Sequence, residues 1–166
     1  DGVANVLNGG AGDDTIDGKA GNDVINGGTG NDLFTIDFSS VDTIDGGANT
    51  LKDTVKFNAG NTGTSIATDT NFVMNSTLTN IEKLDITGLT LNTANNNTEF
   101  NFTEAMIDAW TGNSTGNLTL SFTSSQREKI MFTDIGGTVR DTAAEIVDNT
   151  TYTIGNSSLT IDITDV

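Results

Sequence analysis

Residues 9–35 read GGAGDDTID, GKAGNDVIN and GGTGNDLFT, which are three nine-residue units joined end to end without a spacer. A short fixed period dictates a fold that a search for separate helices and strands would miss. In every unit the first and fourth residues are glycine, the sixth is aspartate and the eighth is large and apolar. Each unit therefore predicts a tight turn that carries one carboxylate, followed by a short strand that carries one core residue.

The invariant positions of the units define two predicted ladders. The glycines are Gly9, Gly12, Gly18, Gly21, Gly27 and Gly30, the aspartates are Asp14, Asp23 and Asp32, and the apolar residues are Ile16, Ile25 and Phe34. A degraded unit precedes them, with Asn5 at the aspartate position and Leu7 at the apolar position. Positions 7, 16, 25 and 34 are therefore the predicted core ladder, and the sixth positions are the predicted acidic ladder.

The three units resemble the glycine-rich nonapeptide of the repeats-in-toxin (RTX) family, whose pattern is G-G-x-G-x-D. The resemblance implies a calcium-loaded parallel β-roll, in which two units make one coil and every second turn stacks on the same edge. It implies one ion between Asp14, Asp32 and the carbonyls of Gly10, Gly12, Gly27 and Thr29. On the opposite edge it implies that Asp23 pairs with Asn5 and Asp42; Gly21 and Gly30 complete the predicted metal-site residues.

Calcium is the metal that this set of ligands favours. It takes about six to eight oxygen ligands, whereas magnesium demands stricter geometry and retains its waters. The alternative is an array of surface turns that binds nothing. That alternative leaves stacked carboxylates without a counter-ion and does not explain the strict spacing.

The composition excludes several classes of function. The chain has 166 residues, a net charge of −16 and only seven basic residues, which argues against a nucleic-acid partner. It contains no cysteine and no histidine, so it lacks disulfides, thiolate metal sites and the commonest general base. It has no apolar run long enough to span a membrane. Because no histidine can activate a serine, we expect a protein that is not an enzyme.

The regular period ends after Thr35 and predicts a division of the chain. Asp42 and Asp53 are each followed two residues later by an apolar residue. In the unit that contains Asp53, two more residues separate the first glycine from the aspartate than in a regular unit. We therefore predict an RTX calcium-binding β-roll over 1–56 and a β-rich region over 57–166. At Asp42, Asp45 and Asp53 both calcium binding and a simple turn role remain open.

Alternating apolar residues predict strands within residues 81–88, 117–124, 128–135, 151–156 and 157–166. A weaker strand is expected at 71–75, a loop at 92–97 and a one-turn helix at 142–149. A short helix is expected in FTEAMIDAWTG, capped by Thr103, with Phe102, Met106 and Trp110 on one face, and ended by Gly112. Trp110 is either a core anchor or a ligand-stacking residue. The fold class is all-β, a parallel roll followed by a β-solenoid or β-sandwich-like region with one short helix.

The second half resembles, in NIEKLDITG, AWTG and TYTIGNSSLTIDITDV, the carboxy-terminal region of large bacterial RTX adhesins and surface-layer proteins. This resemblance implies a secreted, extracellular protein of the bacterial cell surface, with the type I secretion machinery as a partner and its signal near the carboxyl end. Three hypotheses follow: a calcium-triggered folding and export module, a self-assembling adhesin or surface-layer building block, and a module that binds glycan, peptide or ice. Copies of the chain and cell-surface polysaccharide are the further partners considered.

Overall fold

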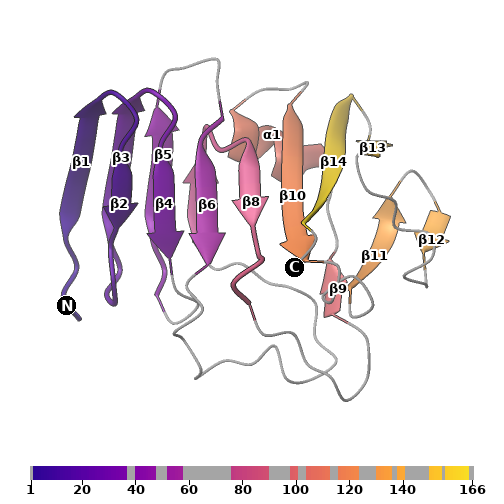
Figure 1. Ribbon diagram of the computed structural model, residues 1–166, viewed down its shortest axis with the longest axis horizontal. Helices are drawn as coiled ribbons and strands as arrows, with labels where there is room; N and C mark the ends of the chain where they lie inside the picture. Colours follow the sequence, from indigo (N-terminus) through magenta and orange to yellow (C-terminus); the bar gives the residue numbers. More distant parts are fainter. Residues whose placement is uncertain are drawn as a thin grey trace.

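Two parallel β-sheets face each other and are wound by one chain that passes from sheet to sheet (Figure 1). The computed structural model describes residues 2–36, 40–47, 52–57, 76–89, 98–100, 104–112, 116–123, 130–135, 138–140, 150–154 and 156–164. The predicted strand at 71–75, the loop at 92–97, the one-turn helix at 142–149 and the capping residue Thr103 lie outside these residues.

The strands alternate between the two sheets along the chain. The first sheet has the order β1 (Val6–Ala11), β3 (Val24–Thr29), β5 (Thr43–Gly47) and β7 (Thr77–Thr79). The second has the order β2 (Thr15–Asp17), β4 (Leu33–Ile36), β6 (Thr54–Phe57), β8 (Lys83–Asp85), β10 (Asn117–Thr123), β14 (Ser157–Thr164) and β13 (Thr151–Ile154). A small third sheet contains β12 (Thr138–Arg140), β11 (Ile130–Ile135) and β9 (Thr98–Phe100). Within the two large sheets every described pair is parallel except β13 with β14.

The register confirms the predicted coil of two units. Leu7 lies opposite Ile25 in the first sheet, and Ile16 lies opposite Phe34 in the second. The next coil keeps the core ladder in line although its loops are longer, because Phe34 pairs with Val55. The strand register is therefore preserved although 21 residues separate Phe34 from Val55, against 18 between Ile16 and Phe34.

A single apolar core fills the space between the two sheets and runs past residue 57. The fully buried side chains include Ile25, Phe34, Ile44, Val55, Phe57, Leu78, Leu84, Leu118, Leu120 and Ile161, and the partly buried Leu7 and Ile16 pack at its first coil. Burial of each such side chain contributes about 1.5–3 kcal/mol. Since β6 pairs with β8, β8 with β10 and β10 with β14, these strands of the second half extend the second sheet of the roll, whereas β9, β11 and β12 form a sheet of their own.

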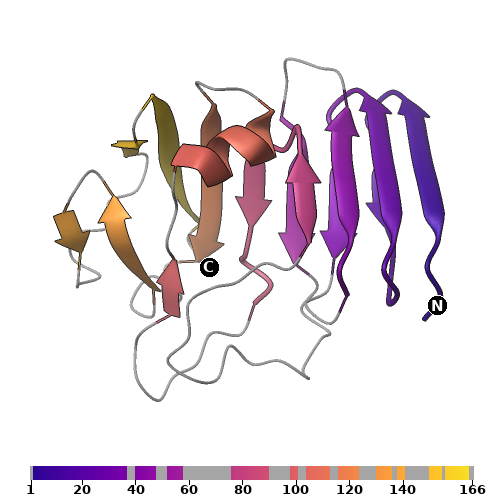
Figure 2. The same ribbon diagram turned by 180° about the vertical axis from the view of Figure 1, so that it is seen from behind.

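Helix α1 (Glu104–Thr111) lies beside β7, the last described strand of the first sheet. It covers β10 and β14 (Figure 2). Ile107 is fully buried and Trp110 is 8% exposed, so the core-anchor interpretation of the tryptophan is confirmed. Met106 is partly buried beside them, whereas Phe102 lies outside the described residues. Gly112 follows the helix with a φ of 65°, a left-handed conformation that suits glycine at a helix end. No helix in the described part of the chain is long and apolar enough to cross a membrane.

A polar row on the outer face of the second sheet joins three strands of the second half. The ammonium of Lys83 on β8 lies 3.1 Å from Oδ2 of Asp162 on β14, and the hydroxyl of Ser121 on β10 donates to the same oxygen at 2.6 Å. The hydrogen bond from Ser121, with the nearby charge of Lys83, lowers the pKa of Asp162 below its ordinary value. The carboxylate form is therefore the one that the folded state prefers.

Replacing Asp162 with asparagine is expected to lower the free energy of unfolding at neutral pH by at most about 1 kcal/mol, because the side chain is partly exposed to solvent. A carboxyl whose pKa is depressed by folding stabilises the protein above its unfolded pKa and loses that effect as the pH falls through the folded pKa. The gap between wild type and Asp162→Asn should therefore close on acidification. Urea unfolding in calcium from about pH 6 to pH 3 measures it. A gap that stays constant with pH contradicts the assignment.

Candidate metal-binding edges

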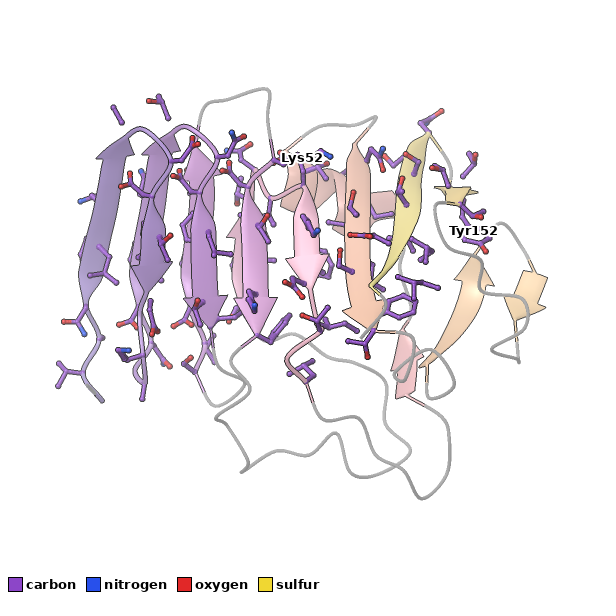
Figure 3. The ribbon with its side chains drawn as sticks, viewed as in Figure 1. Lys52 and Tyr152 are labelled. Carbon is purple, nitrogen blue, oxygen red and sulfur yellow. The ribbon has the colours of Figure 1, made fainter. Side chains whose placement is uncertain are left out.

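The acidic turns line two opposite edges of the coils. The Asp14 edge comprises the turns that lead from β1 to β2, from β3 to β4, from β5 to β6 and from β7 to β8, at the top of Figure 1. The Asp23 edge, at the opposite end of the strands, comprises the described residues that precede β1, β3, β5 and β7. Rows of oxygen-tipped side chains mark both edges, and Lys52 lies at the Asp14 edge (Figure 3). The two edges are thus separate candidate sites on one scaffold.

On the Asp14 edge each acidic side chain reaches back to the coil before it. The N–H of Asp14 donates to Oδ1 of Asp32 at 2.8 Å, and the N–H of Asp32 donates to Oδ1 of Asp53 at 2.7 Å. The N–H of Asp53 in turn donates to Oε2 of Glu82 at 2.9 Å. These four residues form a continuous acidic ladder, in which Asp14 and Asp32 are adjacent as predicted.

The Asp23 edge repeats the arrangement with a different ending. The N–H of Asn5 donates to Oδ1 of Asp23 at 2.8 Å, and the N–H of Asp23 donates to Oδ1 of Asp42 at 2.9 Å. The structure thus places Asn5, Asp23 and Asp42 in the predicted order. Here the ladder ends in hydroxyls, because Ser76 Oγ accepts the N–H of Asp42 and Ser40 Oγ donates to Asp42 Oδ2, both at 3.0 Å.

The second carboxylate oxygen, Oδ2, of four ladder residues is the unusual feature of these edges. In Asp14, Asp23, Asp32 and Asp53 this oxygen is buried and accepts no hydrogen bond from the described residues. Asp23 and Asp32 are each only 1% exposed. A buried carboxylate oxygen without a donor costs several kcal/mol unless a cation neutralises it. The orphaned oxygens therefore fit a bound metal ion.

The first glycine of each unit leaves the space into which these oxygens point. An ideal Cβ on Gly9 would lie 2.6 Å from the carbonyl oxygen of Gly27 and 2.7 Å from Asp14 Oδ2. One coil later, a Cβ on Gly27 would meet Asp32 Oδ2 and lie 2.7 Å from the carbonyl oxygen of Gly46. Two acceptor oxygens thus converge beside Gly9 and beside Gly27, whereas the nearest oxygen beside Gly18 is Asp23 Oδ2 alone. Two acceptor oxygens cannot hydrogen-bond to each other, and they are suitable ligands for a hard cation such as calcium.

The remaining predicted carbonyl ligands point along the stack. The carbonyls of Gly10 and Gly12 face the next coil at Gly28 and Gly30, all four glycines having left-handed φ values between 106° and 134°. The carbonyl of Thr29 accepts the N–H of Gly12 at 2.7 Å. On the other edge Gly21 lies against the carbonyl of Val3. Of the predicted carbonyl ligands, that of Gly27 therefore lies nearest to a ladder carboxylate, Asp14. The ligand roles of the whole predicted set remain a prediction.

No three acidic side chains of the described residues meet at one point. Among the described residues, an ion at either edge would therefore be held by at most two carboxylates together with main-chain carbonyls. The ion pairs between described residues involve Asp17, Asp85 and Asp162, all outside the acidic ladders. The ion pairs between described residues thus leave the Oδ2 atoms of Asp14, Asp23 and Asp32 without a basic side chain beside them.

Sequence reasoning missed two features of the edges. The fifth residue of each unit bonds forward to the next coil: Asp13 accepts the N–H of Asn31 at 2.8 Å, and Asn31 accepts the N–H of Lys52 at 3.0 Å. The recurrence of aspartate or asparagine at this position was the available signal. Glu82, whose pKa is raised by burial, was the other omission, because nothing in its surroundings resembles a repeat.

Residues 1–34 match the family model of the RTX calcium-binding nonapeptide repeat in four copies. The matched span includes the degraded unit around Asn5. This part of the chain is an RTX calcium-binding region, calcium is the metal that such repeats bind, and RTX repeat proteins are typically secreted. No curated protein and no solved structure matches the chain. Everything after Phe34, including Asp42 and Asp53, lies outside the match.

Proposed function

We propose that this chain is a non-catalytic, calcium-dependent folding, export and structural module of a bacterial surface protein secreted by a type I system. The observation that carries the proposal is the set of buried Oδ2 atoms at Asp14, Asp23 and Asp32, which accept no hydrogen bond. These three residues lie in the RTX region. Calcium would supply the positive charge that neutralises these oxygens. It would be held by the aspartates and the neighbouring carbonyls.

Calcium concentration would decide which state the chain adopts. Extracellular calcium sites have dissociation constants of about 10⁻⁴ to 10⁻³ M, so they stay empty in a cytosol poor in calcium. There the ladder carboxylates repel one another and the glycine-rich coils remain unfolded, in a form suited to a narrow export channel. Outside the cell, binding to the folded state alone adds its free energy to folding.

A calcium titration of chelator-treated protein tests this proposal. In chelator we expect the circular dichroism spectrum to lack the β signal of residues 2–57. Millimolar calcium should restore it, while magnesium at the same concentration should not. Native mass spectrometry should count bound calcium ions over the same titration. Full β content in chelator, or no bound calcium at millimolar concentration, would overturn the proposal.

The building-block version of the proposal makes a separate prediction about assembly. A self-assembling adhesin or surface-layer building block should form larger particles when calcium is added, whereas a folding and export module should stay monomeric. Light scattering of the purified chain across the calcium titration distinguishes the two. Either result is compatible with calcium-dependent folding, so this measurement decides only the architectural role.

A further inference from the structure

We infer that Gly46, Asp53 and Asn80 form an additional calcium site, outside the nonapeptide repeats, which couples the ion to the docking of helix α1. The inference rests on the proposed function, namely that the acidic ladder holds calcium. It concerns residues beyond the matched repeats, because these end at Phe34.

The geometry of this site repeats that of the regular coils. An ideal Cβ on Gly46 would lie 2.5 Å from Asp53 Oδ2 and closer still to the carbonyl oxygen of Asn80. The same arrangement is found at the Asp14 end of the ladder, where a Cβ on Gly9 would meet Asp14 Oδ2 and the carbonyl oxygen of Gly27. Here, however, the carbonyl belongs to an asparagine in a turn with no glycine pattern.

The backbone of Asn80 is held in an uncommon conformation that aims its carbonyl at this point. Its φ is 55°, one of two positive values found among the described residues other than glycine. Asparagine tolerates the left-handed region better than most residues, but the conformation still needs support. The support is a hydrogen bond at 2.8 Å from Nδ2 of Asn80 to Oδ1 of Asp45. Its side-chain oxygen lies against Gly112, at the end of α1.

The charges at this point favour a cation with oxygen ligands. Asp53 is 0% exposed, and its Oδ1 already accepts the N–H of Asp32 at 2.7 Å. Its Oδ2 faces another acceptor, the carbonyl of Asn80. The carboxylate of Glu82 lies close by, since its Oε2 accepts the N–H of Asp53 at 2.9 Å. Two carboxylates and a carbonyl, all hard oxygen donors, match calcium better than a softer metal.

The site is linked to α1 through the residues on either side of the turn. The N–H of Ile81 donates to the carbonyl of Trp110 at 2.6 Å. Asn80, immediately before it, touches Gly112 at the end of the same helix. An ion that fixes the carbonyl of Asn80 therefore also fixes the turn against which α1 ends. Trp110 is the only tryptophan in the chain, so its fluorescence reports on this docking.

The variant Asp53→Asn tests the site with little change of shape. Its Oδ1 still accepts the N–H of Asp32, and its amide replaces Oδ2 with a donor that can bond the carbonyl of Asn80. Native mass spectrometry at millimolar calcium should count one ion fewer than in wild type. The Trp110 fluorescence of the variant should lose the part of its calcium response that arises at this site. Asp85→Asn, on the outer face beside Lys56, removes the same charge and should leave the ion count unchanged.

Gly46→Ala supplies a second test in which every carboxylate stays in place. Its methyl group would occupy the point where the two oxygens converge, so one ion should again be lost. If both variants retain the ion count of wild type, the inference is wrong while the proposed function stands. If wild type itself binds no calcium, the proposed function fails first. Loss of one ion in both variants, with the count of Asp85→Asn unchanged, supports the site.

Discussion

Gly27→Ala is expected to raise the calcium concentration needed to fold the coils at least about tenfold, which corresponds to ~1.4 kcal/mol. The new methyl group would meet Asp32 Oδ2 and would lie 2.7 Å from the carbonyl oxygen of Gly46 and 2.8 Å from Cζ of Phe34. Overpacking alone costs about 1–3 kcal/mol, and two of these three neighbours are the oxygens assigned to the ion. The variant should therefore lose both stability and calcium affinity.

Two other glycines separate the possible causes. A Cβ on Gly2 would have no atom within 4 Å, so Gly2→Ala should fold at the calcium midpoint of wild type. A Cβ on Gly10 would also find open space, but its φ of 109° strains any side chain. Gly10→Ala therefore measures backbone strain without crowding. Circular dichroism during calcium titration gives the three midpoints. Equal midpoints for Gly27→Ala and Gly2→Ala would contradict the role assigned to the space beside Gly27.

The repeat period made the first two coils predictable down to individual contacts. Because each unit has the same length, Asp14 must lie over Asp32, and Ile16 must lie over Phe34, in any parallel coil of two units. The expected order of Asn5, Asp23 and Asp42 followed in part from the same rule. The orphaned Oδ2 atoms were not predictable, because they depend on which way each carboxylate turns.

Beyond the repeats, contacts could not be predicted in this way, because the spacing of the units is no longer constant. Which residue lies next to Asp53 in the ladder depends on how many residues separate β6 from β8, and no period in the sequence fixes that number. Asp53 could be named as a candidate from its spacing to Val55, but its partners could not. Likewise, the end of the other ladder at Ser76 follows from that same connection.

The second half shows the limit of reading alternation. Alternating residues such as Leu118 and Leu120 correctly predicted a strand with one buried face. Alternation does not identify the neighbouring strand, so a solenoid and a sandwich remained equally open. The register that pairs Leu120 with Leu84 and with Ile161 comes from three distant segments. Only the folded arrangement shows that, among the described residues, one core runs from the first coils to β14.

Phe34→Ala is expected to lower the free energy of unfolding in calcium by about 3–5 kcal/mol, the usual cost of removing a buried aromatic ring. Phe34 is 0% exposed and lies in the second sheet between Ile16 and Val55. Because a parallel coil contacts only its neighbours, the cavity would separate the first coil from the third. Urea unfolding at saturating calcium measures the loss. Val24, on β3 of the first sheet, is 50% exposed, so Val24→Ala should change stability by no more than about 0.5 kcal/mol.

The same substitution should also weaken calcium binding, although Phe34 has no oxygen to offer. Its ring supports strand β3 at Gly27, since Cζ lies 2.8 Å from the point where a Cβ of that glycine would stand. If folding and binding are one linked process, stability lost from the core appears as a higher calcium midpoint. Phe34→Leu, which keeps most of the apolar volume, should recover much of both losses. A Phe34→Ala protein that unfolds more easily but retains the calcium midpoint of wild type would show that the core and the metal edges fold independently, and the linkage on which the export mechanism depends would not hold.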